Sequence, residues 1–214
     1  MNTKFLWPLL IALSTTLFSP ASFAFTATDL ISLAGKAISS AQAGVAQINE
    51  TSAPIPSDAR IETGFSPNGQ ALGLVLRTIG SAAETLDVMA YSFTSAEVTR
   101  ALLQAAKRGV RVRVLVDYQH NLVKDKSGKP ISALSALATA GADIRTVSKY
   151  AIFHDKVIIA DKRHLQTGSF NYSQSAAQRN SENVIVLWNA NETASQYAMH
   201  FESRWRQGDK FSGR

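Results

Sequence analysis

The sequence predicts an α/β fold: a mixed, largely parallel β-sheet flanked by helices on both faces. Three features predict it. Short runs rich in Val, Ile and Thr alternate with segments of helical periodicity, and these helices are long enough for crossover connections. Two later runs are separated by only a few polar residues, which indicates an antiparallel hairpin. A chain of 214 residues has room for one domain with a sizeable core besides a leader.

The first 24 residues have the layout of a secretory signal peptide. Lys4 lies in a short polar start, an apolar stretch follows from Phe5 to Phe18, and Ser22 and Ala24 are the small residues before a cleavage site. About 14 apolar-rich residues are fewer than the ~20 needed to span a bilayer. We therefore expect an exported protein, periplasmic or secreted, without stable membrane association after cleavage. An uncleaved anchor is the alternative.

Residues 25–57 predict an N-terminal helix and a linker. Apolar residues recur at helical spacing at Leu30, Ala34, Ala37, Ile38, Ala41, Val45 and Ile48. Pro54 and Pro56 end this pattern. The main domain is therefore expected at 58–214.

The main domain begins with alternating strands and helices. Strands are expected at 59–67, 85–93, 110–118 and 142–147, and helices at 68–82, 95–109 and 132–140. Ser95 is expected to cap the helix at 95–109, and Gly141 is expected to end the helix at 132–140. The polar segment 118–130 follows a strand, where loops often line sites in α/β folds, although a solvated connection is equally compatible.

The alternation of strands and helices ends after residue 150. Strands at 154–161 and 164–170 form the hairpin, and a strand at 182–189 and a closing helix at 192–208 follow.

The composition restricts the chemistry of the protein. There are no cysteines, which excludes disulfides and thiolate metal sites. The 22 basic and 16 acidic residues give a net charge of +6, and loss of Lys4 with the leader leaves 21 against 16, or +5. This balance favours polyanionic partners such as nucleic acid or anionic lipid headgroups.

The hairpin carries the strongest functional pattern. In a strand, side chains two apart share a face, so His154 and Lys156 are expected to point the same way. The returning strand brings Ser169 and Asn171 beside them. This set suits a phosphoryl group: Lys156 supplies charge, the hydroxyl and carboxamide supply donors, and His154 acts as nucleophile or proton carrier.

Two further residues of this pattern have structural roles. Gly168 lets the backbone approach closely because it lacks a Cβ. Asp161 is expected in the hairpin turn, where it bonds backbone amides and holds the hairpin without taking part in chemistry.

The run from His154 through Lys156 and Asp161 to Gly168, Ser169 and Asn171 resembles the signature of the phospholipase D superfamily. The continuation through Glu182 is similar to the small exported bacterial endonucleases of that superfamily, and the likeness covers residues 59–207, including 90–95. The resemblance implies a phospholipase D-like catalytic domain at 58–214.

The resemblance also implies a mechanism. Members of this superfamily use two motif copies: one His attacks phosphorus to give a phosphohistidine, and the other protonates the leaving oxygen. This sequence has one copy, because His120, His164 and His200 are not followed by Lys at the second position. We therefore expect an obligate homodimer with one composite site at a two-fold axis.

Roles follow for the remaining candidates. Lys156 and Asn171 of both chains would neutralise the phosphoryl oxygens, and Ser169 would bind phosphate or support its loop. Glu182 is the candidate carboxylate that orients His154, and the resemblance implies that it acts across the dimer, on the partner chain. The alternative is that Glu182 is an ordinary surface charge at the start of a strand. No cofactor and no metal site are expected, and activity should persist in chelator.

The expected function is a metal-independent phosphodiesterase, an endonuclease that cleaves DNA with little sequence preference, with RNA left open as a second substrate. A groove flanked by basic residues would follow the phosphate backbone, drawn from Arg108, Arg111, Arg113, Lys124, Lys126 or Lys149. The alternatives are a phospholipase D-type lipid phosphodiesterase and a catalytically silent nucleic-acid-binding dimer.

Overall fold

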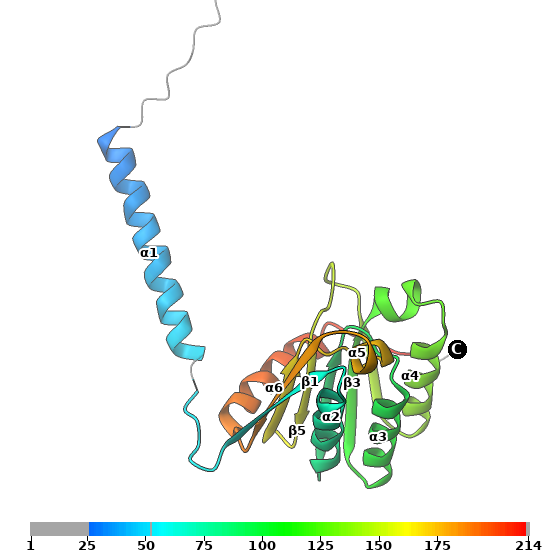
Figure 1. The fold of residues 1–214 in the computed structure, drawn as a ribbon. Coiled ribbons are helices and arrows are strands. Elements are labelled where there is room, and N and C mark those ends of the chain that lie inside the picture. The colour runs from blue at the N-terminus through cyan, green and yellow to red at the C-terminus, as the bar shows by residue number, and fades with distance from the viewer. Residues whose placement is uncertain (1–25, 52, 213–214) are drawn as a thin grey trace, which may run out of the picture. The chain divides into compact units, whose positions relative to one another are not determined.

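The computed structural model describes residues 26–51 and 53–212 (Figure 1). The chain divides after Glu50 into two compact units, which are described separately. The predicted signal peptide at 1–24 lies outside the described residues and stays a prediction, as do the predicted domain boundaries.

The first unit holds all but the last residue of one long helix, α1 (Ala27–Thr51), within the range where the sequence predicts a helix. Thr26 and Asp29 cap it reciprocally: the Asp29 amide donates to the Thr26 hydroxyl (3.1 Å), and the Thr26 amide donates to the Asp29 carboxylate (2.9 Å). Leu30, Ile31 and Ile38 are each more than half exposed. Among the described residues, no helix combines the length and the apolar character that a membrane span requires.

The second unit is built on one eight-stranded sheet with the order β1-β7-β6-β5-β2-β3-β4-β8. Its strands are β1 (Arg60–Ser66), β2 (Thr85–Ala90), β3 (Arg111–Asp117), β4 (Asp143–Val147), β5 (Lys156–Ala160), β6 (His164–Gly168), β7 (Glu182–Trp188) and β8 (Asp209–Lys210). Its helices are α2 (Gln70–Ser81), α3 (Ala96–Lys107), the π-helical turn η1 (Gln119–Lys124), α4 (Lys129–Thr139), α5 (Gln174–Gln178) and α6 (Asn191–Trp205).

The fold class is confirmed: the sheet is mixed and has helices on both faces (Figure 1). The expectation that it is largely parallel is wrong. Only the β2–β3 and β3–β4 ladders are parallel, whereas β1–β7, β7–β6, β6–β5, β5–β2 and β4–β8 are antiparallel. The reason is that β1 and β2 are not neighbours: α2 carries the chain from the sheet edge to its centre, and the hairpin and β7 fill the gap.

The sheet separates two cores because successive side chains of its strands point to opposite faces. In β5, Ile158 and Ala160 pack into the core that α2, α3 and α4 cover. Val157 and Ile159 point the other way and pack with Phe201 of α6. Strands that are apolar on both sides fit the middle of such a layered sheet.

The predicted hairpin of β5 and β6 is confirmed, with Ala160 opposite His164. The turn residues Asp161 and Lys162 have φ of 55° and 51°, the positive values that a tight hairpin turn requires. Three elements were not predicted: η1, α5 and β8, all of six residues or fewer. Such short elements carry too little periodicity to be recognised in a sequence.

Candidate active site

The candidate residues gather at one edge of the sheet, where β2 and β3 end and β5 begins. Ala90 at the end of β2 is opposite Lys156 at the start of β5. Tyr91 directly follows β2, and Tyr118 directly follows β3. The ends of parallel strands are the usual place for ligand sites in α/β folds.

His154 and Lys156 lie together, although not as two residues of one strand. β5 begins only at Lys156, so His154 precedes it, and the expected strand start at 154 is wrong. Lys156 is 5 % exposed, and its ammonium donates to the His154 carbonyl oxygen (2.7 Å). This bond ties the backbone of His154 to the Lys156 side chain, and the His154 side chain is exposed whereas Lys156 is buried.

The ring of Tyr91 lies at the centre of this group. Its centroid is 4.7 Å from that of the His154 imidazole, in an edge-on arrangement, and 4.2 Å from that of His120. The Lys156 ammonium lies 5.6 Å from the same ring centroid, which is within cation–π range. Tyr91 therefore contacts three groups from two other segments: His120 of η1, and His154 and Lys156 around the start of β5.

The electrostatics favour a neutral His154. Partial desolvation and the charge of Lys156 hold the pKa of His154 below its ordinary value, against the opposing pull of Asp155 and Asp117. Burial also lowers the pKa of the Lys156 ammonium, and Asp155 and Glu182 oppose this shift. A neutral imidazole nitrogen is the form that can attack phosphorus.

Ser169 and Glu182 form a second group beside the first. The Ser169 hydroxyl donates to the Glu182 carboxylate (2.6 Å), and it accepts from the amide of Asn183 (3.0 Å). The other Glu182 oxygen accepts from the Asn180 side chain (2.9 Å). Within one chain these contacts tie the loop after β6 to the start of β7, and the predicted orienting role of Glu182 remains a prediction.

Gly168 allows this close approach. Its φ is +147°, a conformation that L side chains rarely adopt, and the carbonyl of Asn183 occupies the space that a Cβ would need. The amide of Ser169 donates to that same carbonyl (3.1 Å).

Asn171 presents a buried acceptor. Its side-chain oxygen is shielded from solvent and has no hydrogen-bond partner in the single chain. The next residue, Tyr172, is fully buried, and its carbonyl accepts from the amides of Thr94 and Ser95 (2.8 Å each). Asn171 therefore lies beside the segment that follows Tyr91.

Asp161 bonds backbone amides as expected, but not those of its own hairpin. Its carboxylate accepts from the amides of Ala83, Glu84 and Thr85 at 2.7 to 2.9 Å. Partial burial would raise the pKa of this carboxyl, and the three amide bonds outweigh that effect and hold the pKa low. Asp161 thus fastens the hairpin to the start of β2, at the end of the sheet away from His154.

Sequence reasoning missed the residues that hold Tyr91 in place. Asn121 of η1 is fully buried and bonds the Tyr91 carbonyl (2.7 Å) and the Phe93 amide (2.9 Å). Asp117, also buried, accepts from the amides of His120 (2.6 Å) and Phe153 (2.9 Å). The only sequence signal was the placement of the polar segment 118–130 after a strand.

Residues 26–51 and 53–212 contain no group of three or more His, Cys, Asp or Glu side chains placed to hold a metal ion. In the same residues, two cations of the expected basic groove have other partners. Arg113 forms a two-pronged ion pair with Asp87 (2.7 and 2.8 Å), and Arg108 bonds the carbonyl of Ala82 (3.2 Å). Arg113 is a structural cation of the α6 face and is not available to a phosphate backbone.

Comparison with known proteins identifies relatives of this arrangement. Residues 75–205 match the family model described as "Cardiolipin synthase, PLD-like domain". A phospholipase D from Rickettsia conorii is 34% identical over 177 residues, which cover 83% of this chain and 82% of that protein. A human mitochondrial cardiolipin hydrolase is 34% identical over 142 residues, or 66% of this chain and 54% of that protein.

A solved structure is also similar. The crystal structure of Nuc from Salmonella typhimurium, a phospholipase D family member, is 40% identical, with a TM-score of 0.69. The match covers 72% of this chain and 99% of the Nuc chain. The residues that match the family model, 75–205, include His154, Lys156, Asn171 and Glu182.

Proposed function

The chain belongs to the phospholipase D superfamily of phosphodiesterases, and from this premise we propose that it is a metal-independent endonuclease that cleaves DNA. One observation carries the proposal: the exposed imidazole of His154, whose pKa is shifted toward the neutral form, and the ammonium of buried Lys156 lie against the same Tyr91 ring. A nucleophile beside a fixed positive charge is what attack on a phosphodiester needs.

The proposed reaction has two steps. A neutral nitrogen of His154 attacks phosphorus, a nitrogen–phosphorus bond forms, and the bond to the leaving oxygen breaks as that oxygen takes a proton from a second imidazole. Water then attacks the phosphohistidine, gives its proton to the second imidazole, and frees His154. Lys156 and Asn171 would stabilise the charge on the non-bridging oxygens in both steps.

The second imidazole is proposed to come from a second copy of the chain. His164 lies at the other end of the hairpin, where its Nδ1 accepts from the amide of Asn189 (3.0 Å), and His200 lies on α6. His120 lies against the Tyr91 ring beside His154, with 4.2 Å between the centroids of His120 and Tyr91, and is the alternative from the same chain. A two-fold dimer would place the partner's His154 against the same phosphate. The buried, unpartnered oxygen of Asn171 is consistent with a site that a single chain leaves incomplete.

Nucleic acid is proposed as the substrate on two grounds. The chain has a net charge of +6, and the solved relative Nuc is 40% identical over almost its full length. Export to the periplasm or medium, predicted from residues 1–24, would place such an enzyme among extracellular nucleic acids.

A lipid phosphodiesterase is the second candidate, because the Rickettsia and human relatives carry the names phospholipase D and mitochondrial cardiolipin hydrolase. The same two-step chemistry would apply. The excess of basic residues would then bind anionic lipid headgroups.

The test is nicking of supercoiled plasmid by the purified protein in excess EDTA, with the variant His154→Ala alongside. We expect nicking by the wild type only. Loss of nicking in EDTA that Mg²⁺ restores would contradict the metal-independent mechanism. Hydrolysis of cardiolipin vesicles without nicking would favour the lipid candidate, and binding of plasmid without any hydrolysis would favour a silent binding dimer.

A further inference from the structure

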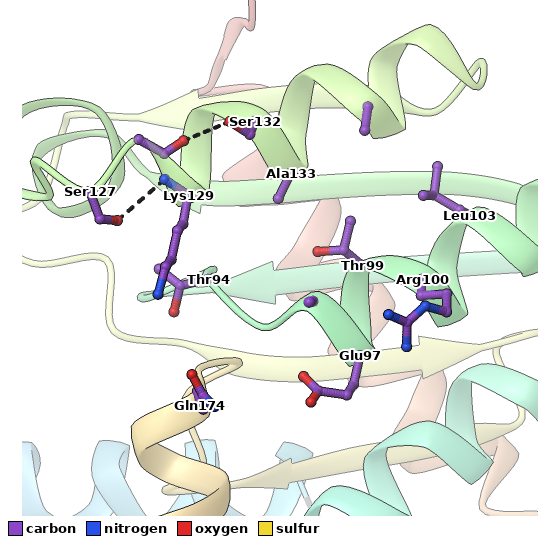
Figure 2. A pocket seen from close by; sticks show the side chains of 13 residues that line it. Thr94, Glu97, Thr99, Arg100, Leu103, Ser127, Lys129, Ser132, Ala133 and Gln174 are labelled. Carbon is purple, nitrogen blue, oxygen red and sulfur yellow. Dashed lines mark hydrogen bonds between the residues drawn. The ribbon is translucent and has the colours of Figure 1, made fainter.

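A cavity of about 610 Å³ lies beside the candidate site, between the N-terminal halves of α3 and α4 (Figure 2). We call it the α3–α4 cavity. None of His154, Lys156, Asn171 or Glu182 lines it, so the proposed chemistry leaves it without a role.

Two segments that contribute to the site each supply one residue to the lining of the cavity. Thr94, three residues after Tyr91, lines it, and so does Gln174, three residues after Asn171. These segments are joined at this point, because the Thr94 amide donates to the Tyr172 carbonyl (2.8 Å). A substrate strand that follows these two segments away from the phosphate site would reach the α3–α4 cavity.

The lining combines an apolar slot with polar ends. Leu103 of α3 and Ala133 of α4 belong to the two helical walls (Figure 2). The charged side chains of the lining are Glu97, Arg100 and Lys129, and its neutral polar side chains are those of Thr94, Thr99, Ser127, Ser132 and Gln174. An apolar slot with a few polar groups of both charges suits a flat heterocycle that carries a phosphate.

Glu97 gives the cavity a fixed acceptor. Its backbone amide and the hydroxyl of Ser95 (3.0 Å) hold the pKa of its carboxyl below the usual range, so it is ionised at neutral pH. A carboxylate accepts hydrogen bonds from the exocyclic amino groups of nucleobases. The nearby cations Arg100 and Lys129 can contact the flanking phosphates.

We propose that the α3–α4 cavity receives one unpaired nucleotide of the substrate, next to the phosphate that is cleaved, and that the enzyme therefore prefers single-stranded nucleic acid. This inference rests on the proposed function. A base inside a duplex has its edge paired and its faces stacked, so it can enter such a slot only after extrusion, which costs free energy. The polar lining argues against an acyl chain, which would cover polar side chains without giving them hydrogen-bond partners.

Three variants test the proposal. Ala133→Phe fills the slot, and Arg100→Ala and Lys129→Ala each remove an exposed rim cation. Lys107→Ala is the matched control, because it removes an exposed cation from the last turn of α3, outside the cavity. The substrates are a short single-stranded oligonucleotide, its duplex, and bis(4-nitrophenyl) phosphate, which has no base.

We expect the wild type to cleave the single strand with a kcat/KM about tenfold above that for the duplex. Each of the three variants should lower kcat/KM for the single strand by about tenfold and leave hydrolysis of the chromogenic diester within about twofold. The control should match the wild type. Equal cleavage of both strands by the wild type, or variants that match the control, would overturn the proposal.

Oligonucleotide binding separates this proposal from the proposed function. Fluorescence anisotropy with the His154→Ala background measures binding whether or not the protein is a nuclease. Weaker binding of the single strand by Ala133→Phe, with a melting temperature near that of the parent, supports the cavity. The proposal would be overturned if all three variants bound the oligonucleotide as tightly as the parent does. It would also be overturned if the only activity that the variants lost were hydrolysis of phospholipid vesicles.

Discussion

Replacing Gly168 by alanine tests how tightly the candidate site depends on the close approach of β6 and β7. A Cβ at this position would lie 3.0 Å from the carbonyl carbon and 3.1 Å from the Cα of the next residue in β7, and closer still to the oxygen of Asn183. All three contacts are with backbone, so no side-chain rotation can relieve them. The two strands would have to separate.

Two terms contribute to the cost. Holding alanine at a φ of +147° costs about 1–3 kcal/mol. The steric displacement of β7 costs a further 1–3 kcal/mol or so, as overpacking generally does. We therefore expect the free energy of unfolding of Gly168→Ala to fall by at least about 2 kcal/mol. Cleavage should fall as well, because the shift breaks the contacts of Ser169 with Asn183 and Glu182.

Urea denaturation monitored by circular dichroism measures this loss, and Gly73→Ala is the matched control. Gly73 lies in α2, and a Cβ there would meet nothing within 4 Å. That variant should be more stable than the wild type by about 0.5–1 kcal/mol, since alanine favours the helix. If Gly168→Ala unfolded within about 0.5 kcal/mol of the wild type, the steric reasoning would be refuted.

Three further predictions concern the pKa shifts and the Tyr91 ring. Asp161→Asn should lower the free energy of unfolding at pH 7 by about 1–2 kcal/mol after allowance for solvent screening. The pKa of Asp161 is lower in the folded state than in the unfolded state, where it is about 3.9. Its contribution to the free energy of unfolding is therefore present above about pH 3.9 and is lost as the pH falls through the folded pKa. Below about pH 4, the free energy of unfolding of Asp161→Asn in urea should therefore depend less on pH than that of the wild type. Lys156→Ala should raise the pKa of His154 toward its ordinary value in an NMR titration, since the Lys156 charge, after desolvation, lowers it; no change would contradict the assignment. Tyr91→Ala should reduce plasmid nicking at least about tenfold while Tyr91→Phe retains it, because the contacts are made by the ring; equal losses would point to the hydroxyl instead.

The alternation of strands and helices was predictable because most elements are long enough to show their period. The turn at Asp161 was predictable for a related reason: aspartate tolerates a positive φ. The sheet order was not. Sequence spacing favoured parallel neighbours along the chain, whereas β1 pairs with β7, more than 100 residues away.

The site was predictable as a set of residues and not as a geometry. The spacing of His154 and Lys156 suggested a shared strand face, but the strand starts at Lys156, and the bond from Lys156 to the His154 carbonyl replaces that arrangement. Tyr91 and Asn121 were missed because their contact joins segments 30 residues apart. No local pattern encodes such a contact.

The central claim is that two copies of His154 serve one phosphate, and a purified heterodimer tests it most directly. Wild-type and His154→Ala chains carrying different affinity tags would be co-expressed, and the mixed dimer would be isolated over both tags. A composite site needs both imidazoles, so the mixed dimer should nick plasmid at least about a hundredfold more slowly than the wild-type dimer. Retention of roughly half the wild-type rate would contradict the account, because each chain would then hold a complete site of its own.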